Sequence, residues 1–123
     1  MDFIIEQKPA GRIVFELFEK IAPGTVQNFK AFCSGEFSTE QNNLHYRGSK
    51  IFRIIEGKKV LGGDVVCNNG QGEISIYGKN FDDENFEIKH NKRGMLSTVF
   101  RGINRNNSQF CISLGKLNEM DYK

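Results

Sequence analysis

Alternating apolar and polar residues at the start of the chain predict a β-hairpin. Residues 2–7 are strand-like, residues 8–11 (Lys-Pro-Ala-Gly) suit a turn, and residues 12–18 form a second strand-like run. In that second run, apolar side chains at every other position share one face, which a period of two directs toward a core: Ile13, Phe15 and Leu17.

A single helix is predicted between Pro23 and Gly35. Proline suits the first helical turn, Thr25 is available as a cap nearby, and glycine suits the position where a helix stops. Apolar residues recur at spacings of three and four, so they form one stripe: Val26, Phe29, Phe32 and Cys33. Residues 36–49 are polar and rich in turn formers, which predicts a loop.

The rest of the chain predicts four short strands separated by loops: residues 50–55, 58–61, 95–100 and 108–114. Residues 65–92 hold few apolar runs and are expected to be irregular. In the last strand the even-numbered residues are expected on the core face: Phe110, Ile112 and Leu114. The odd-numbered residues are expected on the opposite face: Gln109, Cys111 and Ser113. Strands and helices do not alternate regularly, so the fold class is mainly β, an antiparallel sheet or barrel with one packed helix.

Composition supports one globular domain. The chain has 123 residues, 38% hydrophobic residues and 11 Phe, enough for one core. No run approaches the roughly 18 apolar residues of a membrane span, and no leader opens the chain, so we expect neither a membrane nor export. The three cysteines form no metal motif, and the two histidines stand far apart. We therefore expect reduced thiols, a cytoplasmic location, no metal and no cofactor.

Charge is distributed unevenly along the chain. Residues 45–61 carry five bases and one acid, a net of +4, and residues 88–105 carry five bases and no acid. Four acids form a local cluster between these two segments, with no base among them: Asp82, Asp83, Glu84 and Glu87. Either these are solvated loops, or they form a basic surface for RNA or an acidic partner. No aromatic-rich nucleic-acid motif accompanies the bases, so nucleic acid is not expected.

Two polar residues interrupt strand-like runs. Arg53 lies within Ile-Phe-Arg-Ile-Ile, and Gln109 lies within Ser-Gln-Phe-Cys-Ile. Both side chains point to solvent, or both line one shallow site on the outer sheet face, with Arg53 as a fixed donor and Gln109 as an adaptable partner. They lie 56 positions apart in the sequence, so the pattern alone does not show that the two side chains belong to one site.

Several motifs, in order, resemble those of the cyclophilin family. They cover nearly the whole chain: Gly-Arg-Ile-Val-Phe-Glu-Leu at 11–17, Ala-Pro-Gly-Thr-Val-Gln-Asn-Phe-Lys-Ala-Phe-Cys-Ser-Gly-Glu at 22–36, Phe-Arg-Ile-Ile-Glu-Gly at 52–57, Gly-Gly-Asp at 62–64, Ser-Ile-Tyr-Gly at 75–78, Phe-Asp-Asp-Glu-Asn-Phe at 81–86 and Asn-Ser-Gln-Phe at 107–110.

The resemblance implies a closed antiparallel β-barrel capped by helices, acting without a cofactor as a peptidyl-prolyl cis–trans isomerase. Amide resonance sets a rotation barrier of about 18–20 kcal/mol. Family members hold the proline ring in an apolar pocket while an arginine donates toward the prolyl nitrogen, which favours the twisted transition state. Arg53 occupies the position of that arginine, and Gln109 that of a glutamine that contacts the substrate backbone. These two are the predicted catalytic residues.

The floor of the proline pocket departs from the family pattern. Lys58 and Lys59 stand where the family has an aromatic residue and a methionine, and Leu61 replaces a glutamine. Cys111 replaces a second pocket phenylalanine, beside Phe110, a further pocket position. Burying one Phe side chain contributes about 1.5–3 kcal/mol. Two lysines and a cysteine therefore predict a weak proline site.

The residues at the rim of the predicted pocket also differ from the family pattern. Val99 and Phe100 replace a small residue and an asparagine that present backbone to the peptide. Glu119 aligns with the tryptophan associated with cyclosporin binding, and Met120 with the following leucine. The pocket histidine would lie beyond Lys123. We expect little or no isomerase activity from this substrate-binding surface.

The resemblance also implies about two further strands and a second helix beyond residue 123. We therefore expect one domain, 1–123, with its barrel incomplete at the C-terminus. The predicted function is a weakly active or inactive structural component of a larger assembly. Its expected partners are proline-containing segments or a neighbouring protein that covers the open barrel. The alternatives are an active isomerase that assists protein folding and an X–Pro binding module without turnover. Residues 44–46 and 90–94 resemble a branch that includes cilium-associated members, which would place the domain in a cytoskeletal or ciliary assembly.

Overall fold

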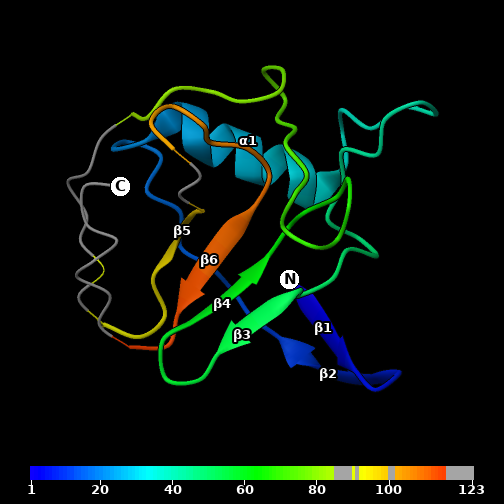
Figure 1. The fold of residues 1–123 in the computed structure, drawn as a ribbon, viewed down its shortest axis with the longest axis vertical. Helices are drawn as coiled ribbons and strands as arrows, with labels where there is room; N and C mark the ends of the chain where they lie inside the picture. Colours follow the sequence, from blue (N-terminus) through cyan, green and yellow to red (C-terminus); the bar gives the residue numbers. More distant parts are fainter. Residues whose placement is uncertain (85–89, 91, 100–101, 116–123) are drawn as a thin grey trace.

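The computed structural model describes residues 1–84, 90, 92–99 and 102–115, which form two antiparallel sheets and one helix (Figure 1). The elements are β1 (Asp2–Ile5), β2 (Lys8–Arg12), α1 (Pro23–Ser34), β3 (Arg53–Ile55), β4 (Lys59–Gly62), β5 (Leu96–Thr98) and β6 (Phe110–Ser113). Strands β1 and β2 pair with each other, and the other four pair in the order β3-β4-β6-β5. The mainly β fold with one helix in the N-terminal half is confirmed. The described strands do not close into a barrel.

The N-terminal hairpin differs from the sequence prediction in its turn. The turn lies at Glu6 and Gln7, whose φ angles are 49° and 66°, and Lys8–Arg12 is a strand instead of a turn. A two-residue turn with both φ angles positive matches the strand twist, even without glycine. Pro9 is tolerated because β2 is exposed along its whole length.

The strand predicted at residues 12–18 is wrong beyond its start. Pairing ends where Met1 and Ile13 exchange two backbone hydrogen bonds of 2.9 Å, and no described strand lies alongside residues 14–18. Phe15 and Leu17 nevertheless pack on the core from an irregular segment, whereas Ile13 is 43% exposed. The alternating pattern therefore identified two core residues of this segment correctly but predicted the wrong secondary structure for them.

Helix α1 begins and ends at the predicted residues. Pro23 occupies the first turn, and Gly35 ends the helix in the left-handed conformation with φ 75°. Thr25 is not the cap, because the N-cap is Ala22 and its side chain accepts no capping bond. The expected stripe is buried at three positions, but Cys33 is exposed. Asn28 and Ala31 complete the buried face instead.

The core lies between α1 and one face of the four-stranded sheet. Four aromatic rings form its centre: Phe29, Phe32, Tyr46 and Phe110. Phe29 meets Phe110 edge-on at a centroid distance of 5.8 Å, and Phe32 stacks on Tyr46 at 5.3 Å. The Tyr46 hydroxyl donates to the Ser108 carbonyl at 2.5 Å. This bond ties the loop after α1 to the segment that leads into β6.

The four strands predicted after residue 49 all form, with different ends. Each is antiparallel to its neighbours, and Ile112 packs beside Phe110 on the core face as expected. The odd-numbered residues are buried as well: Cys111 and Ser113 in β6 and Gln109 directly before it. No helix of the described part of the chain is long and apolar enough to cross a bilayer.

Removing the Tyr46 hydroxyl should destabilise the fold. In Tyr46→Phe the buried Ser108 carbonyl loses its donor, so we expect the free energy of unfolding to fall by about 1–3 kcal/mol. The matched control is Tyr77→Phe, because the exposed Tyr77 hydroxyl donates to the Gly24 carbonyl, where water can replace it. Urea titrations would measure both variants. Equal losses would contradict the assigned role of the buried bond.

Candidate functional site

Strand register places the predicted site residues in one row across the sheet. Arg53 pairs with Leu61, Leu61 with Cys111, and Cys111 with Ser97. Directly opposed residues of antiparallel strands share a face, so these four side chains lie on the face opposite the aromatic core. We call it the site face. Lys59, which pairs with Ser113, shares it by the same argument.

Arg53 stands at the β3 edge of the site face. Its side chain is exposed, and among the described residues it has neither a hydrogen-bond nor an ion-pair partner. All five guanidinium N–H groups are therefore available to a ligand. A strand holds the backbone below them, which limits where the donors can point.

The middle of the site face is small and apolar. Leu61 and Cys111 are buried together, with Phe52 and Val99 packed against them. Burial raises the pKa of the Cys111 thiol, although the Lys59 charge and a hydrogen bond from Ser97 act in the opposite direction. Cys111 is therefore a protonated, buried part of the floor. The charge of half-buried Lys59 is close enough to be felt by this sulfur.

Lys58 differs from Lys59 in its placement. It lies in the turn between β3 and β4, where its N–H donates to the Ile55 carbonyl at 2.9 Å and its carbonyl accepts from Leu114 N–H at 2.7 Å. Its side chain is exposed. Lys59 thus belongs to the site face itself, and Lys58 belongs to the turn at the end of β3.

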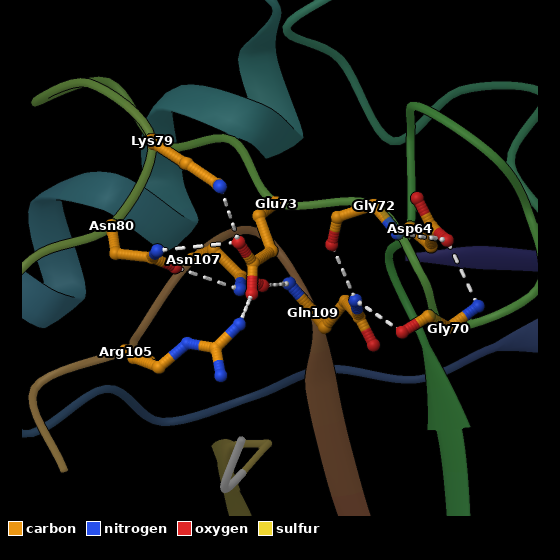
Figure 2. A network of polar contacts seen from close by, with 9 residues as sticks. All are labelled: Asp64, Gly70, Gly72, Glu73, Lys79, Asn80, Arg105, Asn107 and Gln109. Atoms are coloured by element: carbon orange, nitrogen blue, oxygen red, sulfur yellow. Dashed lines mark hydrogen bonds and ion pairs between the residues drawn. The ribbon is translucent and has the colours of Figure 1, made fainter. Parts of the chain in front are cut away.

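Gln109 is buried, which neither sequence interpretation included. Its side chain is 1% exposed, and its amide nitrogen donates to the carbonyls of Gly70 (3.1 Å) and Gly72 (2.7 Å) (Figure 2). Two acceptors fix which end of the amide is the nitrogen. The side-chain oxygen is buried and has no hydrogen-bond partner within the described residues. Gln109 is therefore a buried residue that is held by the loop at residues 70–72, whereas Arg53 is exposed.

A buried carboxylate shapes the loop that holds Gln109. Asp64 is 1% exposed and accepts backbone N–H bonds of 2.8–3.2 Å. The donors are Val66, Cys67, Asn69, Gly70 and Gly72. Burial opposes ionisation, but these N–H groups outweigh it and lower the pKa of Asp64 below its usual value.

Close approach in this loop requires glycine. A Cβ at position 72 would lie 2.0 Å from the Asp64 Oδ1 atom. The Gly-Gly-Asp motif at 62–64 and the Gly-Gln-Gly segment at 70–72 are therefore two ends of one hydrogen-bonded loop.

A second polar network reaches Gln109 from the other side. The Glu73 carboxylate pairs with Lys79 at 3.2 Å and with Arg105, and it accepts from Asn80 at 3.5 Å. The hydrogen bond from Lys79 lowers the pKa of Glu73 most, and Arg105 and Asn80 lower it further. Desolvation acts in the opposite direction but is outweighed. Asn80 accepts from Asn107 at 3.2 Å, and the Asn107 side chain accepts from Gln109 N–H at 3.0 Å (Figure 2).

Sequence reasoning missed this network because its members come from three separate loops. A buried glutamate among lysine, arginine and asparagines looks like an ordinary solvated loop in one dimension.

The remaining predicted residues fall into two groups. Phe110 lies on the opposite face, inside the aromatic core, since it pairs with Gly62 and Thr98. Phe100, Glu119 and Met120 lie outside the described residues. The structure therefore brings together Arg53, Leu61, Cys111, Gln109 and Lys59, with Val99 at their border.

Comparison with known proteins places this geometry in a family. The family model "Cyclophilin type peptidyl-prolyl cis-trans isomerase/CLD" matches residues 1–123. "Peptidyl-prolyl cis-trans isomerase 9" of Caenorhabditis briggsae is 44% identical over 116 residues, which cover 92% of this chain and 37% of that protein. "Probable inactive peptidyl-prolyl cis-trans isomerase-like 6" is 42% identical in Bos taurus and 41% in Homo sapiens, over 125 residues that cover 100% of this chain and 41% and 40% of those proteins.

The chain thus spans about two fifths of the length of these curated relatives. The family match extends over the whole of the chain, including both strands and loops of the site face. This chain belongs to the family of cyclophilin-type peptidyl-prolyl cis–trans isomerases.

Proposed function

We propose that this chain is a weakly active or inactive cyclophilin-like domain that serves as a structural and interaction component of a larger assembly. The observation that carries the proposal is the floor of the site face, where Lys59 and Cys111 flank Leu61. Where the family places an aromatic ring, a buried cysteine leaves less apolar surface. Full burial of a Phe side chain contributes about 1.5–3 kcal/mol, so a proline ring gains little here.

The names of the relatives support this proposal in part. Two of the three are called "Probable inactive peptidyl-prolyl cis-trans isomerase-like 6", and the third is called an isomerase without that qualification. An active isomerase that assists protein folding is therefore the alternative. In that case Arg53 would donate toward the prolyl nitrogen and weaken its conjugation with the carbonyl.

Binding of X–Pro segments without turnover is a second candidate, favoured by Arg53. Its side chain is exposed on the site face and has no partner in the described part of the chain. An extended peptide carries C=O groups that can accept from such donors. These contacts do not require the apolar floor, so binding can persist where catalysis is lost.

A neighbouring protein is part of the proposal, because large apolar side chains stand exposed outside the site face. Ile4 is 71% exposed, Ile54 67% and Val14 86%. Burial of such residues against a partner would be favourable. Free cysteines at positions 33, 67 and 111 suit a reducing compartment, which supports a cytoplasmic location. A ciliary or cytoskeletal assembly rests on residues 44–46 and 90–94 alone.

The chain should not accelerate prolyl isomerisation at a family rate. Uncatalysed X–Pro rotation takes tens to hundreds of seconds, and we expect exchange NMR of a short X–Pro peptide to give nearly the same rate with the protein as without it. Arg53→Ala should leave that rate unchanged. Acceleration by the wild-type chain that disappears in Arg53→Ala would establish the active alternative and refute the proposal.

Replacing Asp64 should loosen the loop that holds Gln109. In Asp64→Asn an amide N–H₂ faces backbone donors, so we expect a loss of about 2–4 kcal/mol in unfolding free energy at neutral pH. The Gln109 side-chain amide signals should also shift in NMR spectra. Asp82→Asn, at an exposed carboxylate, is the matched control.

The pH dependence of this loss follows from the lowered pKa of Asp64. A carboxylate with a lowered folded-state pKa contributes its stability above its unfolded pKa of about 3.9. That contribution disappears as the pH falls through the folded-state value. The stability difference between wild type and Asp64→Asn should therefore shrink in acid, as urea titrations at several pH values would measure. A difference independent of pH would argue against ionised Asp64 as the organiser of the loop.

A further inference from the structure

The loop at residues 64–72 contains the one Asn-Gly pair of the sequence, Asn69 followed by Gly70. Such a pair can modify itself, because the glycine backbone nitrogen can attack the side-chain carbonyl carbon of the asparagine. A succinimide ring closes, and the side-chain NH₂ leaves as ammonia with the proton of the attacking nitrogen. Water then opens the ring at either carbonyl, which leaves aspartate or isoaspartate. Glycine favours this reaction, since it has no side chain to hinder the attack.

Both groups that would react are already engaged in the folded chain. The Gly70 N–H donates to the Asp64 Oδ2 atom at 2.8 Å, and the Asn69 N–H donates to the same oxygen at 3.2 Å. The Asn69 side-chain oxygen accepts from the Gln71 N–H at 2.9 Å. The backbone nitrogens of both residues and the asparagine side chain are therefore held in place.

Charge opposes the reaction as well. The Gly70 nitrogen attacks once it has lost its proton, and this loss would leave a negative nitrogen 2.8 Å from a carboxylate oxygen. Asp64 is buried, and its lowered pKa keeps it ionised at neutral pH. The two like charges would therefore meet where water screens them little. The carboxylate that organises the loop thus also keeps the nitrogen protonated.

Packing restrains the loop at the same point. Gly70 is buried with φ 93°, and a Cβ there would lie 3.0 Å from the Phe52 Cε2 atom. The Phe52 ring in turn packs against Leu61 and Cys111. Asn69 is exposed, so water reaches its side chain while the attacking nitrogen stays fixed in the interior. Opening of the loop, and not access of water, therefore limits the reaction.

We propose that Asn69 is a spontaneous modification site that converts to aspartate and isoaspartate, and that Asp64 holds this reaction back as long as the loop at residues 64–72 stays closed. Isoaspartate adds one carbon to the main chain between residues 69 and 70, so the product no longer presents all five N–H groups to Asp64. The Gly70 carbonyl, which accepts from the Gln109 amide, shifts with them. Modification therefore loosens the contact that holds Gln109, whether or not the domain is an isomerase.

Incubation of the full chain beside a synthetic peptide of residues 65–73 tests this inference. Mass spectrometry of the digested samples would follow aspartate and isoaspartate at position 69 over time at neutral pH. We expect the peptide to react at least about ten-fold faster than the folded chain, which corresponds to about 1.4 kcal/mol or more of loop stability. Equal rates, or a peptide that does not react, would overturn the inference.

The variant Asp64→Asn connects the protection to the carboxylate. We expect it to react about ten-fold faster at Asn69 than the wild type, because the Gly70 nitrogen is released. Tyr46→Phe is the matched control, since it removes a buried hydrogen bond outside this loop and should leave the rate unchanged. The reaction requires local and not global opening. An unchanged rate in Asp64→Asn, or an equal rise in both variants, would refute the assignment to Asp64.

A second measurement requires no variant of Asp64. Urea below the unfolding transition should speed modification of Asn69 in the wild type in the same proportion as hydrogen exchange of the Gly70 N–H, because both require the same opening. A modification rate that does not follow this exchange would contradict control by the loop. Asn69→Gln should give no product at this position, since its longer side chain would have to close a larger ring.

Discussion

The site depends on one buried carboxylate. Asp64 has no cation beside it among its hydrogen-bond partners, and its charge is stabilised by five backbone N–H groups of its own loop. Figure 2 shows two of these donors, Gly70 and Gly72. An isolated buried carboxylate is costly, so these N–H groups must remain in place for the fold to tolerate it. They fix the carbonyls of Gly70 and Gly72, which in turn accept from and fix the Gln109 amide nitrogen.

Strand β6 connects this site to the core through its alternation. Phe110 and Ile112 pack with the aromatic cluster, while Gln109 and Cys111 lie on the site face. Because both faces are buried, a slip of one residue would exchange core and site side chains, and the register is strongly specified. The aromatic cluster on the far face is independent of the lysines near the site. Substitutions such as Lys59 and Cys111 can therefore alter the chemistry while the fold remains.

Short-range sequence patterns correctly predicted the helix and most of the strands, because these elements depend on neighbouring residues. Period-two alternation located the four strands after residue 49, and Pro23 with Gly35 located the helix. The failures have long-range causes, since the hairpin turn depends on strand twist and the burial of Gln109 depends on a loop about forty residues earlier. Register, which the sequence does not display, puts Arg53 and Gln109 on one face. The roles of these residues in binding or catalysis remain predictions.

Binding and turnover can separate on this face for a physical reason. Catalysis requires contacts that are stronger in the twisted transition state than in the planar peptide. An apolar floor that holds the proline ring lets an arginine follow the prolyl nitrogen as the bond rotates. In the proposed X–Pro binding without that floor, Arg53 would donate equally well to the backbone in its cis, trans and twisted forms. Such uniform binding raises affinity and leaves the rotation rate unchanged, so an inactive domain of this kind would keep the arginine for recognition alone.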